Sequence, residues 1–377
     1  MVGWAGAGKL AGPTLQGIAR TTAIAQSKGG GVRTYSCTCG NRLFFENNRC
    51  LNCGLELAFC PQCRRLSPIR LDPDGLYRCC HDDCQAQVVK CDNYRRHQVC
   101  NRAVLWSGAA SRQHLCDCCC YNEMIPDLSV PGNRGRWYRL EAAKRRLIYG
   151  LDLLGLPRDA ADGPPRLTFQ FLADTEDPRR PGAAQQAVTG HCQGRITINI
   201  READDDERER LRVQFGEAHR TLIGHFRHEI GHYYWERLVR GRVEGEFKAA
   251  FGDHEQPGYG EALERYYQFG APADWAERCL SAYAAMHPWE DFAETFGAYL
   301  DMVCLLDSAR NQGLPGSGAT QPSLDTMLLD YHQIGIAMNE MNRSVGLVDL
   351  VPEVFVAPIV SKLRFVHQLV CKASPLP

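Results

Sequence analysis

The sequence contains no continuous apolar run of the roughly 18 residues that a membrane-spanning helix requires. We therefore expect no membrane partner. Residues 1–32 contain no acidic residue and lack the continuous apolar centre of a secretory signal. This stretch predicts a disordered tail, with a transit peptide or an over-extended start as the alternatives. Together with the cysteine pairing described below, the lack of a secretory signal favours a reducing, cytoplasmic location.

The overall composition is typical of a globular protein, with 44% hydrophobic and 23% charged residues in 377. Residues 33–147 hold 18 Lys and Arg against 11 Asp and Glu, whereas the residues from 148 onward hold 22 against 33. Four thiolates around one zinc ion carry a net negative charge, so three such sites would cancel most of the N-terminal excess. This balance disfavours a nucleic-acid partner.

Cysteine, by contrast, is abundant and unevenly distributed. Fifteen of the nineteen cysteines lie between Cys37 and Cys120, mostly in close pairs. In a chain without a secretory signal, this pairing indicates metal ligation rather than disulfide bonds. Because the segment has few apolar residues, metal binding would supply much of its folding energy. We predict a zinc-ribbon domain over residues 33–125.

The spacing of these cysteines predicts two to three structural zinc ions, each held by four thiolates. In the second group, either Cys79 or Cys80 completes the site. In the third group, the nearby Cys118 and Cys120 are alternative ligands. The predicted sets are Cys37, Cys39, Cys50 and Cys53; Cys60, Cys63, Cys79 and Cys84; and Cys91, Cys100, Cys116 and Cys119.

After a connector that contains Pro and Gly, the pattern becomes that of a mixed α/β domain. Residues 138–156 place leucines near helical spacing and predict a helix. Residues 166–172 and 194–200 are rich in β-forming residues and predict strands. Further helices are predicted near 207–240, 259–268, 273–286, 290–306 and 359–371.

One motif in this mixed α/β part predicts a catalytic metal site. His228, Glu229 and His232 form the pattern H-E-x-x-H. On a helix the two histidines share a face one turn apart, so both can bind one zinc ion. Glu229 lies beside them, where it can act as a general base toward water. Trp235 and Leu238 stand where a metzincin needs Gly and His, which excludes that class.

A later segment, "HPWEDFAETFGAYL", offers a third ligand. Glu290 and Glu294 lie one helical turn apart within it. We predict that Glu290 completes a catalytic zinc site of the gluzincin kind, and that Glu294 accepts a hydrogen bond from a ligand imidazole. The alternative is a solvated acidic helix face. His225, one turn before His228, is expected in a supporting or surface role rather than as a ligand.

From Cys37 to about residue 370 the chain resembles the zinc-binding metallopeptidases that carry N-terminal zinc ribbons. The segments that carry the resemblance are "CLNCG", "IPDLSVPGN", "RLEAAKRRLIY", "FRHEIGHYYWERL", "SAYAAMHPWEDFAETFGAYL" and "KLRFVHQLV". The resemblance implies an α+β fold, in which a zincin-like metallopeptidase domain over residues 126–377 follows the ribbon. The predicted zinc site with Glu229 as base favours hydrolysis of a peptide or protein substrate, whereas the resemblance does not imply what is cleaved. The enlarged cysteine zone departs from the usual family pattern.

The helix that contains Glu290 also resembles that of lethal-factor peptidases. Tyr283 lies seven residues before Glu290, the offset of a tyrosine in such sites. It is therefore either a donor to the oxyanion or a buried core residue. We expect residues 194–200 to form the edge strand along which an extended substrate binds. Two alternatives stay open: a scaffolding protein whose helix site is only structural, and a nucleic-acid-binding zinc-ribbon protein.

Overall fold

A computed structural model describes residues 34–108, 114–158, 165–176, 184–185, 187–215, 220–314, 323–352 and 354–374. The predicted tail, residues 1–32, lies outside the described residues. The described residues all belong to one unit of the chain, Gly31–Pro377. No helix in these ranges combines the length and the apolar character needed to cross a bilayer. The predicted fold class is confirmed: a cysteine-rich ribbon region precedes a mixed α/β peptidase-like domain.

The ribbon region is built from short antiparallel strands. Gly40 and Gly54 follow cysteines and adopt φ values of 83° and 75°, which a residue with a Cβ rarely adopts, so they close the cysteine turns at low strain. A small hairpin pairs β1 (Tyr35–Ser36) with β2 (Arg42–Leu43). A five-stranded antiparallel sheet follows, in the order β3 (Leu57–Cys60), β4 (Arg65–Leu71), β5 (Tyr77–Cys79), β6 (Gln87–Lys90) and β7 (Ala103–Leu105). The short helix α1 (Asp92–His97) and the 3-10 turn η1 (Cys119–Tyr121) complete this region.

The second sheet has the order β12 (Gly190–Cys192), β13 (Arg195–Asn199), β9 (Thr168–Leu172) and β8 (Asn122–Met124). Strands β8, β9 and β13 are parallel, and β12 returns antiparallel to β13. The strands predicted at 166–172 and 194–200 are thus confirmed as β9 and β13. The expectation that 194–200 forms the edge is wrong, because the hairpin return of β12 covers that side of β13. A separate small hairpin pairs β10 (Thr175–Glu176) with β11 (Ala184–Gln185).

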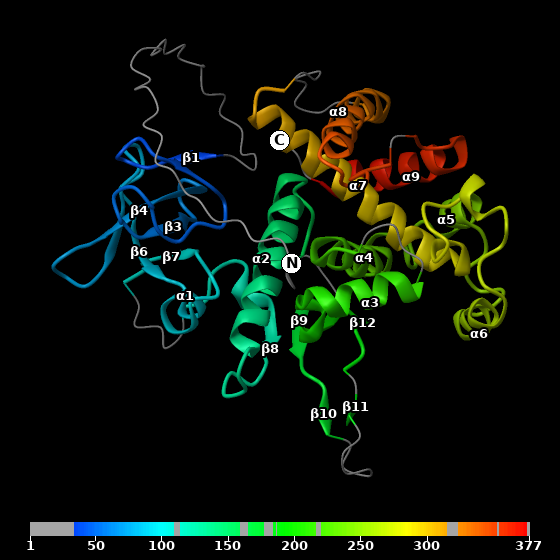
Figure 1. The fold of residues 1–377 in the computed structure, drawn as a ribbon, viewed down its shortest axis with the longest axis horizontal. Helices are drawn as coiled ribbons and strands as arrows, with labels where there is room; N and C mark the ends of the chain where they lie inside the picture. Colours follow the sequence, from blue (N-terminus) through cyan, green and yellow to red (C-terminus); the bar gives the residue numbers. More distant parts are fainter. Residues whose placement is uncertain are drawn as a thin grey trace, which may run out of the picture. The chain divides into compact units, whose positions relative to one another are not determined.

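Three helices occupy the centre of the peptidase region: α2 (Asn133–Leu153), α4 (Leu222–Tyr234) and α7 (Pro288–Asn311). In Figure 1, α2 lies between the blue N-terminal strands and helices α4 and α7. The 3-10 turn η3 (Ile200–Ala203) links β13 to the next helix. The remaining helices are α3 (Asp205–Phe215), α5 (Glu244–Phe251), α6 (Tyr259–Phe269), α8 (Leu324–Ser344) and α9 (Ala357–Ala373).

Two helix predictions differ from the structure. The stretch near 207–240 is not one helix, because α3 and α4 are separate and a π-helical turn, η4 (Trp235–Val239), follows α4. The helix near 273–286 is wrong, since only the 3-10 turns η5 (Trp275–Glu277) and η6 (Ala284–Met286) form there. Lys362 of α9 donates to the carbonyl oxygen of Arg278 at 2.6 Å, an acceptor that a helix would use internally. Tertiary contacts therefore override local propensity in this stretch.

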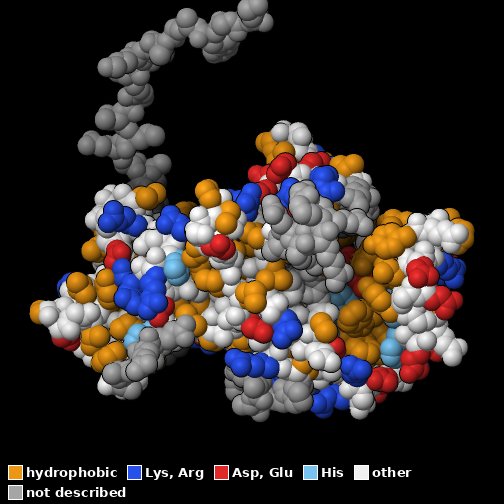
Figure 2. Space-filling model, turned by 90° about the horizontal axis from the view of Figure 1, so that it is seen from below, with side chains coloured by type: hydrophobic (Ala, Val, Ile, Leu, Met, Phe, Trp, Pro, Cys, Tyr) orange, Lys and Arg blue, Asp and Glu red, His pale blue; other side chains and the backbone are white. Residues whose placement is uncertain are grey.

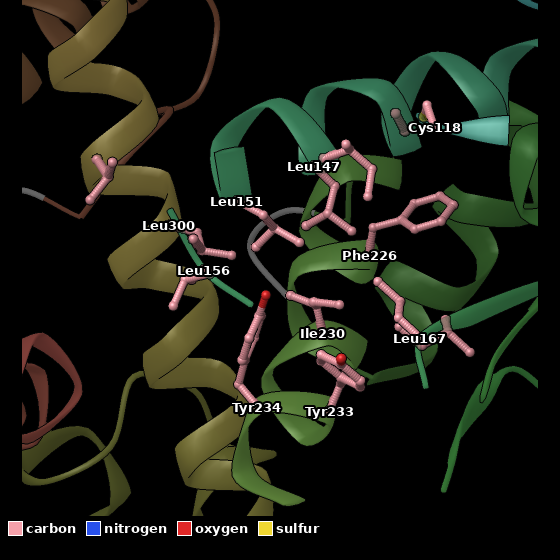
Figure 3. Packing of buried hydrophobic residues seen from close by; sticks show 14 of the residues in the cluster. Cys118, Leu147, Leu151, Leu156, Leu167, Phe226, Ile230, Tyr233, Tyr234 and Leu300 are labelled. Carbon is pink, nitrogen blue, oxygen red and sulfur yellow. The ribbon is translucent and has the colours of Figure 1, made fainter. Parts of the chain in front are cut away.

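The main core lies where α4 meets α2. Phe226, Ile230 and Tyr234 repeat at helical spacing along α4 and face Leu147 and Leu151 of α2, as Figure 3 shows. All five side chains are at most 1% exposed. This apolar stripe fixes the orientation of α4 against both α2 and α7, because Tyr234 also stacks on Phe296 of α7 with ring centroids 5.1 Å apart. The histidines of α4 lie outside the stripe.

The ribbon region and the peptidase region share part of this core. Cys118 belongs to the same buried cluster as Leu147. Arg145 of α2 donates from Nη1 to the carbonyl oxygen of Val99 at 2.7 Å. Strand β8 precedes residue 125 and pairs with β9 of the second sheet. The domain boundary at 125 stays a prediction, and the contacts across it are extensive.

Candidate active site

Helices α4 and α7 cross very closely at Gly231, the glycine of the H-E-x-x-H segment. A Cβ on Gly231 would lie 2.7 Å from the Cα of Ala293 and 2.9 Å from its carbonyl oxygen. Any larger residue would force the two helices apart. The close crossing brings the histidines of α4 within reach of the acidic first turn of α7.

Three donor atoms converge at this crossing. Glu290 Oε2 lies 3.0 Å from His228 Nε2 and 3.3 Å from His232 Nε2, and the two nitrogens are 3.1 Å apart. Four ligands around zinc, with bonds of about 2.0–2.1 Å, are separated by roughly 3.3 Å. Two imidazole nitrogens and one carboxylate are also ligands that zinc prefers. The residues therefore fit a three-coordinate protein site with one position left for another ligand.

Glu294 orients the first histidine. Its Oε1 lies 2.6 Å from His228 Nδ1, so a proton on Nδ1 is donated to Glu294 and the lone pair of Nε2 faces the convergence point. Burial disfavours a charged His228, but its interactions with Glu290 and Glu294 outweigh burial and raise its pKa. The same two carboxylates favour a bound cation.

Aromatic contacts and a helix cap hold the other two donors. The ring of His232 packs on Trp289 with centroids 3.8 Å apart, and His191 of β12 stacks on it at 6.3 Å. The backbone N–H of Trp289 donates to His287 Nδ1 at 3.1 Å, so His287 caps α7 ahead of Pro288. This cap fixes the first turn of α7, which carries Glu290.

Glu229 lies beside the three donors but is not one of them. It is 5% exposed, and its Oε1 lies 3.3 Å from His225 Nε2. Burial raises the pKa of a carboxyl group, but the hydrogen bond from His225 and the charges of the neighbouring histidines outweigh it and lower the pKa of Glu229. The carboxylate is therefore ionised near neutral pH, as a general base requires.

Two tyrosines border the centre. Tyr259 Oη donates to Glu290 Oε1 at 2.9 Å. Tyr283 lies with its ring 6.1 Å from that of His228 and interacts with Tyr259. Burial and the charge of Glu290 raise the pKa of both phenols, so both keep the proton that a hydrogen-bond donor needs.

A cleft of about 340 Å³ opens next to the centre. Tyr259 and Trp289, which contact the donor residues, also line it, together with Trp235, His254 and His287. The three donor residues do not line this cleft, so it borders the centre through Tyr259 and Trp289.

The predicted cysteine sets also come together. The distances between Sγ atoms are 3.6 Å for Cys37 and Cys53, 3.7 Å for Cys60 and Cys84, and 3.8 Å for Cys100 and Cys116. Tetrahedral thiolates with zinc bonds of about 2.3 Å are separated by roughly 3.8 Å, whereas a disulfide bond measures about 2.05 Å. The spacing therefore fits three four-thiolate metal sites.

The structure distinguishes between the alternative cysteine ligands. Cys79 lies with the second set, while Cys80 Sγ donates to the carbonyl oxygen of Arg78. The third set contains Cys91, Cys100, Cys116 and Cys119, all buried. Cys118 is buried but outside the set, and Cys120 is exposed.

Residues 133–369 match the family described as "Putative zinc-binding metallo-peptidase", and residues 34–130 match a zinc-ribbon domain. The chain belongs to this zinc-binding metallopeptidase family. The resemblance identified in the sequence is thus confirmed, and zinc is the metal that the family binds. Uncharacterized proteins of Mycobacterium bovis and Mycobacterium tuberculosis are 36% identical over 356 residues, which is 91% of this chain and 97% of theirs. No solved structure matches the chain significantly.

Within this family member, the structure brings His228, His232 and Glu290 together, with Glu229, Glu294 and Tyr283 around them. Sequence reasoning missed other side chains at the site. Tyr259 and Trp289 carry no spacing signal that links them to H-E-x-x-H. The one available signal for Trp289 is its position directly before Glu290.

Proposed function

We propose that the chain is a zinc-dependent peptidase of the gluzincin type. The observation that carries the proposal is the convergence of His228 Nε2, His232 Nε2 and Glu290 Oε2 within 3.3 Å of one another. Glu229 lies next to this group without joining it, and a purely structural site has no use for an ionised carboxylate in that position.

The chain's residues suit peptide hydrolysis. When bound, zinc polarises a carbonyl group and makes water acidic enough to lose a proton near neutral pH. Glu229 takes that proton and delivers it to the leaving amine. Glu294 keeps the His228 ring oriented. Tyr283, protonated and close to His228, donates a hydrogen bond to the oxyanion that develops on the attacked carbonyl.

We propose that the substrate is an extended peptide or protein segment that adds to β12. This strand is one of the two outer strands of the described four-stranded sheet, and its His191 stacks on the proposed ligand His232. A peptide hydrogen-bonded to β12 would therefore pass the metal centre. On the face shown in Figure 2, basic and acidic side chains are interspersed, so the described residues there form no continuous basic surface of the kind that favours nucleic-acid binding.

We propose four zinc ions in all: one at the histidine–glutamate centre and three in the cysteine sets. The three cysteine sites are structural, because each presents four thiolates and no open position.

The test compares zinc-loaded wild type with Glu229→Gln on a proteome-derived peptide library. The variant should keep four zinc ions and lose cleavage by at least about 100-fold, because it lacks the base. Glu209→Gln removes an exposed carboxylate of α3 instead and should cleave like wild type. Cleavage that persists in Glu229→Gln would refute the mechanism. A wild type that is fully loaded yet cleaves nothing would refute the function.

A further inference from the structure

A buried relay of side chains continues outward from Glu229. His225, one turn earlier on α4, points Nε2 at Glu229 Oε1 at 3.3 Å. The other ring nitrogen, Nδ1, makes a very short contact with Glu202 Oε2. One imidazole therefore bridges two carboxylates, and each ring nitrogen has its own acidic partner.

The outer carboxylate is fixed to the sheet. Thr189 Oγ1 donates to Glu202 Oε1, and the backbone N–H of Asn199 donates to Thr189 Oγ1 at 2.9 Å. Glu202 itself belongs to η3, which directly follows β13. Its position is thus set by the end of the central strand rather than by a surface loop.

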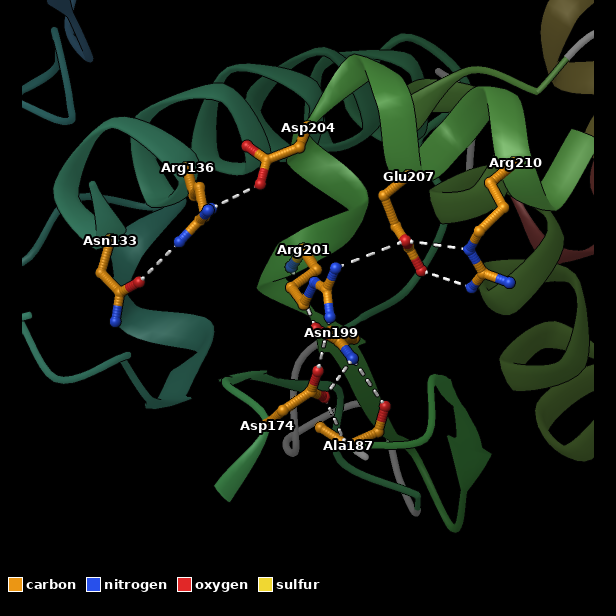
Figure 4. A network of polar contacts seen from close by, with 9 residues as sticks. All are labelled: Asn133, Arg136, Asp174, Ala187, Asn199, Arg201, Asp204, Glu207 and Arg210. Atoms are coloured by element: carbon orange, nitrogen blue, oxygen red, sulfur yellow. Dashed lines mark hydrogen bonds and ion pairs between the residues drawn. The ribbon is translucent and has the colours of Figure 1, made fainter. Parts of the chain in front are cut away.

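A polar network holds η3 in place, as Figure 4 shows. Asn199 Nδ2 donates to Asp174 Oδ1 at 2.8 Å and to the carbonyl oxygen of Ala187 at 3.0 Å. Asn199 Oδ1 accepts from the backbone N–H of Arg201 and caps η3. These bonds leave little freedom to the turn that carries Glu202.

Both carboxylates of the relay are buried, and His225 between them is partly buried. Glu202 and Glu229 are 6% and 5% exposed, so two negative charges lie where water screens them poorly. Burial disfavours a charged His225, but the charge of Glu202 and the hydrogen bonds to Glu202 and Glu229 outweigh burial and raise its pKa to about 9. One cation between two buried anions satisfies all three groups.

The two oxygens of Glu229 are held differently. Oε1 faces His225, while Oε2 is buried and makes no hydrogen bond with any residue that the structure describes. A base needs one oxygen free for the proton that it accepts. The bond to Oε1 stops the carboxylate from rotating and so keeps Oε2 available.

We propose that His225 is a positioning residue: it bridges Glu202 and Glu229 and fixes the carboxylate that serves as the base. This inference rests on the proposed peptidase function, because it assigns His225 a role through Glu229. His225 itself is not one of the three donors that converge at the proposed metal centre. The inference predicts an effect on the rate of proton transfer and none on the number of zinc ions bound.

The kinetic test uses zinc-loaded full-length protein. His225→Phe should lower kcat about 10- to 100-fold with KM and zinc content unchanged, because the base loses its orientation. His225→Gln, which can donate a hydrogen bond from its side chain, should recover part of kcat. Glu202→Gln keeps the shape of the outer partner and serves if the His225 variants do not fold. The exposed His332 on α8 provides the control, and His332→Gln should match wild type.

A second measurement does not depend on activity. The ¹⁵N resonances of His225 at pH 7.5 should show both ring nitrogens protonated, and Glu229→Gln should shift them. Unchanged His225 resonances in Glu229→Gln would overturn the inference, as would wild-type kcat in His225→Phe. If the wild type cleaves no peptide, the proposed function fails, whereas the resonances still decide whether His225 holds Glu229.

Discussion

Gly231→Ala tests whether the close crossing of α4 and α7 builds the metal centre. The added Cβ would lie 2.7 Å from Ala293 Cα, and ordinary contact begins at 3.4 Å, so the helices must separate by about 0.7 Å. The donors of His228 and His232 would move away from Glu290 by a similar amount. Zinc bonds tolerate only about 0.2 Å of displacement.

Overpacking of this kind typically destabilises a packed structure by about 1–3 kcal/mol. Because the bound ion demands the close geometry, this cost appears in zinc affinity, which should fall roughly 5- to 150-fold. Competition with a chromophoric chelator measures the affinity of the histidine–glutamate site, which we expect to be the weakest of the four proposed sites. The cysteine sites should keep their three ions throughout.

Gly297→Ala is the matched control on the same pair of helices. Its Cβ would meet Arg227 no closer than 3.6 Å, which is ordinary contact. This variant should bind zinc like wild type and gain up to about 1 kcal/mol of stability from helix propensity. If Gly231→Ala matched wild type in both zinc affinity and melting temperature, the crossing would not set the site geometry.

Three further outcomes follow from the structure. Tyr259→Phe removes a hydrogen bond to the charged Glu290, worth about 1.5–3 kcal/mol, and should weaken zinc binding about tenfold or more in the chelator assay. Cys116→Ser should release one ion in metal analysis and lower the melting temperature by roughly 10 °C or more, whereas Cys120→Ser should retain all ions. The pKa of His225 is raised from 6.5 to about 9 in the folded state, so protonation of His225 stabilises the fold. This contribution to the free energy of unfolding is fully present below pH 6.5 and is lost as the pH rises through 9. Its contribution of about 3 kcal/mol should be absent from the stability–pH curve of His225→Gln, and identical curves would contradict it.

Local spacing explains why the sequence predicted so much of the candidate site. Two histidines four residues apart share a helix face, and two glutamates four residues apart share another. The order of the two segments then suggested that the faces meet. The role of Gly231 was not predictable, because its importance lies in the distance to Ala293, which is 62 positions away in the chain.

Features that depend on long-range pairing could not be predicted from the sequence. The strand 194–200 has the composition of a strand at either an edge or a centre, and only the return of β12 decides between them. By spacing alone, Cys79 and Cys80 fit equally well as a metal ligand of the second cysteine set. Cys79 ends β5 and Cys80 follows it, so the direction of each side chain depends on the register of that strand. Tyr259 reaches Glu290 from another helix.

Helix α2 has a consequence for how the protein matures. On one side, Arg145 donates a hydrogen bond to the carbonyl oxygen of Val99, the residue before Cys100 of the third cysteine set. On another side, Leu147 and Leu151 pack against α4. In a chain without metal, α2 would lose support on its cysteine side, and α4, which carries His228 and His232, would pack against a less stable neighbour. Loading of the N-terminal cysteine sets would therefore support, through α2, the helix that carries His228 and His232, although these two histidines belong to a separate group of donors.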